Sequence, residues 1–266
     1  MKKKLAAGIV LAFAASPALA ADPIVYDPPP VAAPAVEFDW TGAYIGVQAG
    51  WAFGDIDSSL AVPAGSNINA TATGLALLLG NNDFDTNGFT GGVQAGFNWQ
   101  QGSFVFGVEG DVNYIDLSET NVRTGTFGGA NGRTIDTIDA DILATLRARL
   151  GVAHQNWMFY GTGGIAFSDA EYSRALEWSF ADGCPLGTTG LNRCHVGSDK
   201  FNIGYTVGGG VEYAFNNRFS IKAEYLYTDF GKAEFTTRNV GVANQPLNHS
   251  AHFDFHTVRL GVNMRF

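Results

Sequence analysis

The sequence predicts an all-β fold, a single eight-stranded antiparallel β-barrel that spans a membrane. Eight segments alternate apolar residues with polar residues or glycine, and a period of two places successive side chains on opposite faces of a strand. The connections between these segments alternate between long and short. Glycine occupies 34 of 266 positions and aromatic residues make up 13% of the chain. This composition favours strands and turns over helices.

The N-terminal residues predict export and a short linker. Lysines at positions 2 to 4 precede an apolar run over residues 5–15, and the small residues Ala18 and Ala20 follow. This order is typical of a cleaved secretory signal, and the run is shorter than the ~20 residues that a spanning helix needs. We therefore expect a signal peptide at 1–20. Residues 21–37 hold five prolines and are predicted to form an extended periplasmic linker before a barrel domain at 38–266.

The first four predicted strands cover about residues 40–53, 88–100, 104–115 and 141–153. In the first of them, Ile45, Val47 and Trp51 share one face, and Gln48 lies with glycines on the other. The next three divide their residues in the same way. Each segment exceeds the ~9 to 11 residues that a tilted strand needs to cross a bilayer.

The last four predicted strands cover about residues 157–167 and 201–215, a segment that begins at Phe219, and a segment that ends the chain at Phe266. The fifth strand, 157–167, is apolar on both faces, so its facing stays unassigned. In the eighth, Val258, Leu260 and Val262 alternate with polar residues and glycine. The apolar face of each assigned strand is expected to meet lipid.

The connections predict which end of the barrel faces outward. Residues 54–87, 116–140, 168–200 and 231–250 are long connections, and residues 101–103, 154–156 and 216–218 are short. Long external loops and short periplasmic turns give this pattern in outer-membrane barrels. A soluble sandwich also has alternating connections, but it does not need an apolar outer face on every strand.

Nine charged residues alternate with the apolar residues of these strands and are predicted to point into the lumen. They are Glu109, Asp111, Arg147, Arg149, Glu212, Lys222, Glu224, Arg259 and Arg265. The interior of an eight-stranded barrel is just wide enough to be filled by side chains, so buried charges there have to pair. A plugged lumen follows. A narrow gated conduit through the same charges is the alternative, because the many inward glycines could leave gaps.

Cys184 and Cys194 are the only cysteines. Nine residues separate them in a polar stretch of a chain that is predicted to reach an oxidising compartment, so a local disulfide is expected. A reactive thiol or metal pair is the weaker interpretation, because His195 is the only nearby partner.

His252, Asp254 and His256 share one face of the strand that leads into the eighth segment. This residue pattern makes them weak candidates for a divalent-metal site or a haem contact. Three strand positions cannot complete a coordination shell by themselves. We therefore favour the interpretation that these are polar residues outside the hydrocarbon region of the membrane, and we assign no metal ligand and no cofactor. Haem stays an open alternative.

Residues 71–80 form an unusually apolar stretch inside the first long connection and include Leu75, Leu77, Leu78 and Leu79. Two interpretations are open: the stretch packs over the barrel mouth or against a partner, or it belongs to a hairpin that extends the first two strands beyond the membrane.

The sequence holds no catalytic motif. Ser250, His252 and Asp254 could be drawn as a triad, but they lie too close along the chain for that geometry. We therefore predict that the protein is not an enzyme. The formal net charge is −9, which argues against a nucleic-acid partner.

Several runs resemble the small outer-membrane barrel, or porin-family, surface proteins of alpha-proteobacteria. They are WQQ at 99–101, VFGVEGD at 105–111, LRARLG at 146–151, GGGVE at 208–212, EY at 224–225 and VRLG at 258–261. These proteins are similar in architecture to the OmpA transmembrane domain, and they include surface antigens and some haem-binding members. The resemblance covers the chain from about residue 40 to its end. It matches no haem motif, so that role is not carried over.

The resemblance implies an eight-stranded barrel exposed at the cell surface. It also implies that the terminal Phe266 is the signal which the outer-membrane assembly machinery recognises. The expected function is a structural role in envelope integrity together with surface interaction, and the alternative is a small porin or a haem-binding receptor. The expected partners are outer-membrane lipid and lipopolysaccharide, the assembly machinery, and host or surface ligands of the loops.

Overall fold

The computed structural model describes residues 38–179, 191–239 and 245–266. The predicted signal peptide and linker, and Cys184, lie outside these residues and stay predictions. The described part of the chain forms eight strands and one helix. They are β1 (Gly42–Ala61), α1 (Ala70–Gly80), β2 (Asn82–Gln101), β3 (Phe104–Phe127), β4 (Ala130–His154), β5 (Trp157–Trp178), β6 (Asn192–Ala214), β7 (Phe219–Arg238) and β8 (Pro246–Arg265).

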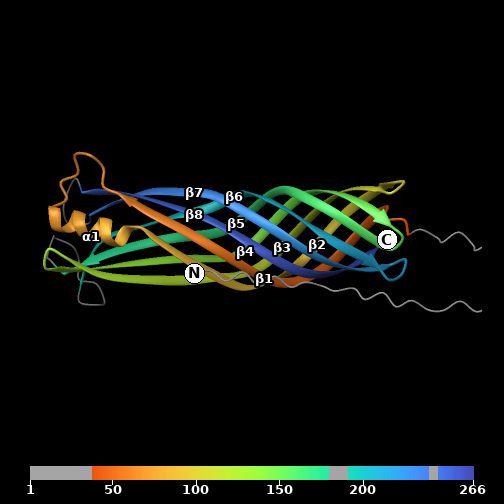
Figure 1. The fold of residues 1–266 in the computed structure, drawn as a ribbon, viewed down its shortest axis with the longest axis horizontal. Helices are drawn as coiled ribbons and strands as arrows, with labels where there is room; N and C mark the ends of the chain where they lie inside the picture. Colours follow the sequence, from red (N-terminus) through yellow and green to blue (C-terminus); the bar gives the residue numbers. More distant parts are fainter. Residues whose placement is uncertain (1–37, 180–190, 240–244) are drawn as a thin grey trace, which may run out of the picture. The chain divides into compact units, whose positions relative to one another are not determined.

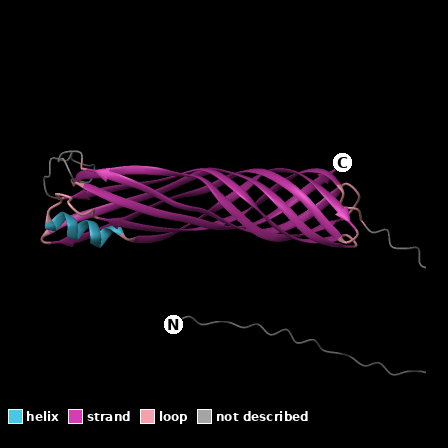
Figure 2. Ribbon diagram, turned by 90° about the horizontal axis from the view of Figure 1, so that it is seen from above, coloured by secondary structure: helices cyan, strands magenta, loops and turns pink. Residues whose placement is uncertain are grey.

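The eight strands close into one antiparallel barrel. Each strand pairs with its neighbours in sequence, and β1 pairs with both β2 and β8. Figure 1 and Figure 2 show the strands winding obliquely around the barrel. Closure leaves no strand edge free. The predicted eight-stranded antiparallel barrel is therefore confirmed.

One half of the barrel, here called the lipid-facing half, carries exposed apolar side chains all around its outside. It includes about residues 42–53, 88–114, 142–167, 203–227 and 256–266. Val47 and Leu146 are each 60% exposed, for example. The fifth strand is also resolved, because Phe159 and Ile165 point outward while Met158 and Tyr160 are buried inside. No helix in the described part of the chain is long and apolar enough to cross a membrane.

The strands are much longer than predicted, and this corrects the four long connections. Each strand has 20 to 25 residues. Strand therefore replaces predicted loop over residues 54–61 and 82–87, over nearly all of 116–140, and over residues 168–178, 192–200, 231–238 and 246–250. In this second half, here called the extension, the alternation inverts. Ile56 is buried between the exposed Asp55 and Asp57, and Phe84 between Asp83 and Asp85. Water replaces lipid as the outer solvent there, so apolar side chains turn inward.

Helix α1 lies at the end of the extension opposite the C-terminus (Figure 1). The side chain of Asn69 caps its first turn by accepting from the backbone N–H of Ala72 at 2.8 Å, as a good N-cap residue does. Leu75 and Leu79 are buried in a cluster with Leu60 of β1 and other inward residues of the extension. Both interpretations of residues 71–80 thus hold in part, because β1 and β2 extend beyond the lipid-facing half and the segment between them packs into the mouth.

Candidate functional site

Eight of the nine predicted lumen charges form one connected network inside the lipid-facing half. Arg147 is at its centre, with its guanidinium nitrogens 2.8 Å from Asp111 Oδ2, 3.2 Å from Glu224 Oε1 and also in contact with Glu109. Arg259 lies 2.6 Å from Glu224 and 3.3 Å from Asp111. These side chains come from β3, β4, β7 and β8, so the network crosses the whole lumen.

Glu109 and Arg149 extend the network toward the periplasmic end. Lys222 Nζ lies 3.1 Å from Glu109 Oε1, and Arg149 lies 3.3 Å from Glu109 and 2.8 Å from Glu212. No side chain in the network is more than 3% exposed. Four carboxylates face four basic groups, so the buried charges balance. Charges removed from water are tolerated when they are paired and hydrogen-bonded.

Two tyrosines that were not predicted from the sequence complete the network. Tyr44 donates its hydroxyl to Glu109 at 2.7 Å, and Tyr160 donates to Glu224 at 2.9 Å. The Arg149 guanidinium lies over the Tyr160 ring, 3.9 Å from its centroid. The available signal was the position of Tyr44, since this residue falls on the polar face of its strand and a buried hydroxyl needs a partner.

The inward glycines of the lumen lie beneath long polar side chains. A Cβ added to Gly46 would come within 2.1 Å of Asn263 Oδ1, which accepts from Gln94 at 2.5 Å. A Cβ on Gly261 would meet the Lys222 side chain at 3.2 Å. Glycine therefore makes room here for side chains that fill the interior.

Arg265 does not join the network. Its side chain points inward at the periplasmic end, where it stacks on Phe38 and Trp40 with centroid distances of 4.9 and 5.1 Å. Its Nη2 donates to the Asp39 carbonyl at 3.3 Å. Phe38 and Trp40 belong to a buried cluster with Met158, so apolar side chains close this end of the lumen.

A second buried ion pair, Arg174 with Asp136, lies in the extension and was missed because both residues fall in predicted loops. Asp136 also accepts from the Tyr172 hydroxyl at 2.7 Å. Arg174 donates to the Gly80 carbonyl at 2.8 Å and to Ser58 Oγ at 2.7 Å. A cation near the last carbonyls of a helix is favourable, so Arg174 holds the C-terminal end of α1.

His252, Asp254 and His256 lie on the outer face of β8, at the boundary between the lipid-facing half and the extension. His252 Nε2 is 3.6 Å from Asp254, whereas His256 Nδ1 is 2.6 Å from the Tyr225 hydroxyl. The ligand atoms that converge within 4.8 Å belong to Asp254, His256 and Asp55. The structure thus brings two of the three candidates together with an aspartate from β1 and leaves His252 outside that group.

Four aspartates, one each from β2, β1, β8 and β7, stand in cross-strand register around this position. Asp55 pairs with Asp85 on one side and with Asp254 on the other, and Asp254 pairs in turn with Asp229. Partial burial and the neighbouring carboxylates of Asp85 and Asp254 raise the pKa of Asp55. Like charges that face each other across neighbouring strands repel. The four carboxylates make the outer face of the barrel acidic at this level.

The remaining predicted residues lie apart from these groups. Cys194 is buried beside α1 in the cluster that contains Leu75, and its predicted bond to Cys184 stays a prediction. Phe266 is 74% exposed and follows the outward-facing Met264, and its N–H donates to the Ala43 carbonyl at 3.1 Å.

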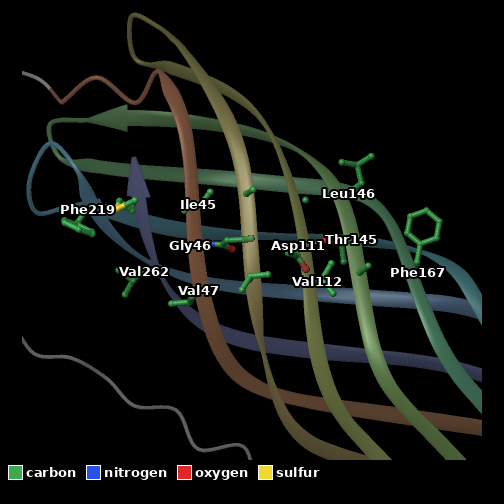
Figure 3. A pocket seen from close by; sticks show the side chains of 16 residues that line it. Ile45, Gly46, Val47, Asp111, Val112, Thr145, Leu146, Phe167, Phe219 and Val262 are labelled. Atoms are coloured by element: carbon green, nitrogen blue, oxygen red, sulfur yellow. Dashed lines mark hydrogen bonds between the residues drawn. The ribbon is translucent and has the colours of Figure 1, made fainter. Parts of the chain in front are cut away.

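An apolar groove of about 850 Å³ lies on the outside of the barrel (Figure 3). Its labelled lining includes Ile45, Val47 and Leu146, which belong to the lipid-facing half. The groove is therefore part of the surface that meets lipid chains. Its lining also includes the buried polar side chains of Asp111 and Thr145, and the Thr145 hydroxyl donates to Asp111 at 2.7 Å.

A closed barrel with a lipid-facing band and a charged, filled lumen defines a transmembrane β-barrel protein. Residues 7–266 match the outer membrane protein beta-barrel domain family, and the chain belongs to this family. It is therefore a protein of the outer membrane, as predicted.

Two relatives bear out the resemblance to alpha-proteobacterial surface barrels. The chain is 37% identical over 272 residues to a 31 kDa outer-membrane immunogenic protein of Brucella melitensis biotype 1, with 100% of both chains covered. It is 30% identical over 186 residues to a 22 kDa outer membrane protein of Rhizobium leguminosarum bv. viciae, with 69% of each covered. Among solved structures, Neisserial surface protein A aligns with a TM-score of 0.33 and 14% identity over 85% of this chain and 98% of that one.

Proposed function

We propose that the protein is a non-conducting surface barrel that strengthens the outer membrane and presents its extension to the outside, without enzymatic activity. The observation that carries the proposal is the balanced network of four acids and four bases. An ion in transit would have to break these buried pairs and lose its own hydration.

Two further layers support a closed lumen. Phe38 and Trp40 fill the periplasmic end. On the external side, a buried cluster that contains Phe201, Phe253 and Phe255 occupies the interior of the extension, and α1 lies beyond it. An apolar layer on each side of the charges opposes the passage of water and ions.

The outside of the extension supports the surface-interaction part of the proposal. Leu77 and Leu78 of α1 and Phe127 at the β3–β4 turn are each about half exposed, so apolar groups stand at the outermost end. Isolated exposed apolar side chains are common, but a group of them favours contact with a partner. The relative from Brucella melitensis is named an immunogenic protein, which agrees with an exposed external end.

We also propose outer-membrane lipid and lipopolysaccharide as the partners of the barrel wall, and host or surface ligands as partners of its external end. The assembly machinery would recognise Phe266, whose exposed ring stands at the end of β8. The acidic row around Asp55 lies just beyond the lipid-facing half, at the level expected for lipid headgroups.

Planar-bilayer recording tests the closed lumen directly. The refolded protein should give no steady conductance under conditions in which an open porin conducts. A variant with alanine at both Glu109 and Arg147 keeps the charge balance while it removes side-chain volume, and it should conduct more readily than the wild type. Large, steady conductance of the wild-type protein would contradict the proposal.

A narrow conduit is the second candidate, because three amide oxygens along β1 and β2 are buried without a hydrogen-bond partner in the described residues. They belong to Gln48, Gln94 and Asn98, and buried acceptors of this kind take water. A small conductance that Gln94→Leu abolishes would support this candidate. A haem receptor predicts a saturable spectral change on titration with haem, and we expect none.

A further inference from the structure

Two buried histidines in the extension share a single hydroxyl group. His195 of β6 and His249 of β8 are 0% and 2% exposed, respectively. Thr237 of β7 lies between them, with its Oγ1 3.2 Å from His195 Nδ1 and 2.8 Å from His249 Nε2. One hydroxyl has one proton, so it donates to one neutral ring and accepts from the other.

The other nitrogen of each ring, His195 Nε2 and His249 Nδ1, is buried without a hydrogen-bond partner among the residues described. While both rings are neutral, one of these nitrogens is a bare lone pair and the other is an unpartnered N–H. Protonation would turn both into unpartnered N–H groups on charged rings. A buried charge without a partner is strongly disfavoured.

Aromatic side chains surround the histidine pair. The Trp178 ring lies edge-on to His195 at 5.4 Å, and the Phe235 ring stacks on His249 at 4.9 Å. Trp178 belongs to the same buried cluster as Leu75 and Leu79 of α1. The pair therefore lies within the packing that holds the helix in the mouth.

The charged groups on the neighbouring elements do not compensate a charged imidazole. Arg174 of β5 repels a proton on His249 and is paired with Asp136 of β4. Glu177 of β5 is buried opposite Arg133 and Arg193 in the strand register. Helix α1 has no charged residue, and the inward residues of β1 here, which are Ser58 and Leu60, are neutral.

Burial lowers the pKa of His195 to about 4. Burial, Arg174 and His195 together lower the pKa of His249 to about 3. Both pKa values lie below the pKa of ~6.5 that a histidine has when it is exposed to water. The neutral pair therefore contributes its full stability above about pH 6.5, and that contribution is lost as the pH falls from there toward the folded values.

We propose that His195 and His249 form an acid-sensitive lock on the external end of the barrel, which releases the α1 cap when the medium becomes mildly acidic while the lipid-facing half stays closed. The lock adds a regulated element to the surface barrel and does not depend on whether the lumen conducts. Release would expose the apolar side of α1, including Leu75 and Leu79, to the outside.

Hydrogen exchange of the full-length protein in lipid vesicles, read by mass spectrometry and corrected for the intrinsic pH dependence, tests the lock. Between pH 7.5 and pH 5.0 the opening equilibrium around residues 70–80 should increase about 30-fold for each histidine and several hundredfold for both, since each histidine contributes about tenfold per pH unit. Residues 42–53 of β1 should show no such change.

Variants identify the groups responsible. The double substitution of His195→Asn with His249→Gln should remove the acid response, and each single substitution should remove one factor of about 30. His252→Asn serves as the matched control, because this histidine lies on the outer face, and it should leave the response intact. Equal exchange at both pH values in the wild type would overturn the proposal. An acid response that survives in the double variant would also overturn it. If the double variant does not insert, an undiminished acid response in both single variants would overturn the proposal.

Discussion

Replacing Glu109 by glutamine tests whether the lumen is a sealed, balanced network. Glu109 contacts Arg147, Arg149 and Lys222. Glutamine keeps its shape but not its charge, so four bases would face three acids. Breaking a buried ion pair leaves an uncompensated charge and is destabilising by about 3–5 kcal/mol. We expect the upper end of this range, because three basic groups lose the same partner.

Urea unfolding from lipid vesicles measures this loss, with tryptophan fluorescence as the signal. All five tryptophans lie in the described barrel. Glu119→Gln is the control, because this carboxylate is exposed on the same strand, and its effect should stay within about 0.5 kcal/mol. The double variant of Glu109→Gln with Lys222→Met restores the balance at three and three, and it should recover part of the lost stability.

A loss below about 1 kcal/mol for Glu109→Gln would refute the reasoning. A value that small is typical of charges in contact with water, so it would mean that the lumen is solvated. The narrow conduit would then become the better interpretation. The same measurement therefore connects the stability of the network to the proposed function.

Three further outcomes are expected. Deleting Phe266 should impair insertion into the outer membrane while export across the inner membrane stays intact, and normal surface exposure of the truncated protein would refute this. Removing both His252 and His256 should leave haem and metal retention unchanged, as absorption spectra and metal analysis after dialysis can show, and a loss of either would reopen the site. Gly46→Ala should lower the unfolding free energy by about 1–3 kcal/mol through overpacking, because its Cβ would come within 2.1 Å of another atom. Gly163→Ala is the matched control, since its Cβ would find no atom closer than 3.6 Å; equal losses in the two variants would contradict the overpacking argument.

The lipid-facing half could be predicted because lipid enforces a strong contrast between the two faces of a strand. The predicted starts at Phe104, Trp157 and Phe219 agree with the structure. Each of these residues follows a short turn, where polar and glycine residues interrupt the pattern abruptly. Strand 157–167 could not be oriented, because glycines on its outer face and apolar Met158 and Tyr160 on its inner face removed the contrast.

The extension could not be predicted from the same rule because the pattern changes sign within a continuous strand. Phe53 points outward and Ile56 points inward, although no residue is inserted between β1 and its neighbours. A window that spans both residues contains apolar side chains on each face, so the alternation disappears at the boundary. The short motif Asp55-Ile56-Asp57 carried the missing signal, since it alternates with the opposite phase.

The lumen charges could be identified from facing alone, but their partners could not. Glu109 on β3 contacts Lys222 on β7 across the lumen. Closure of the barrel brings these two side chains together, and the local alternation of residues along a strand does not encode that closure. Arg174 and Asp136 were hidden for a different reason. The segments that hold them were predicted to be loops, so no inward or outward facing could be assigned to either side chain.

The two halves are stabilised by different forces, and this explains why the external end is the part suited to opening. In the lipid-facing half, outward apolar groups meet lipid chains, so its charged interior has to satisfy itself through pairing. In the extension, water surrounds the outside and an apolar interior supplies the hydrophobic driving force. Each histidine buried in that interior also makes the stability of the extension depend on pH below about 6.5. Opening of the extension exposes apolar groups and neutral rings, whereas opening of the other half would expose eight buried charges to lipid. The first is much the smaller change.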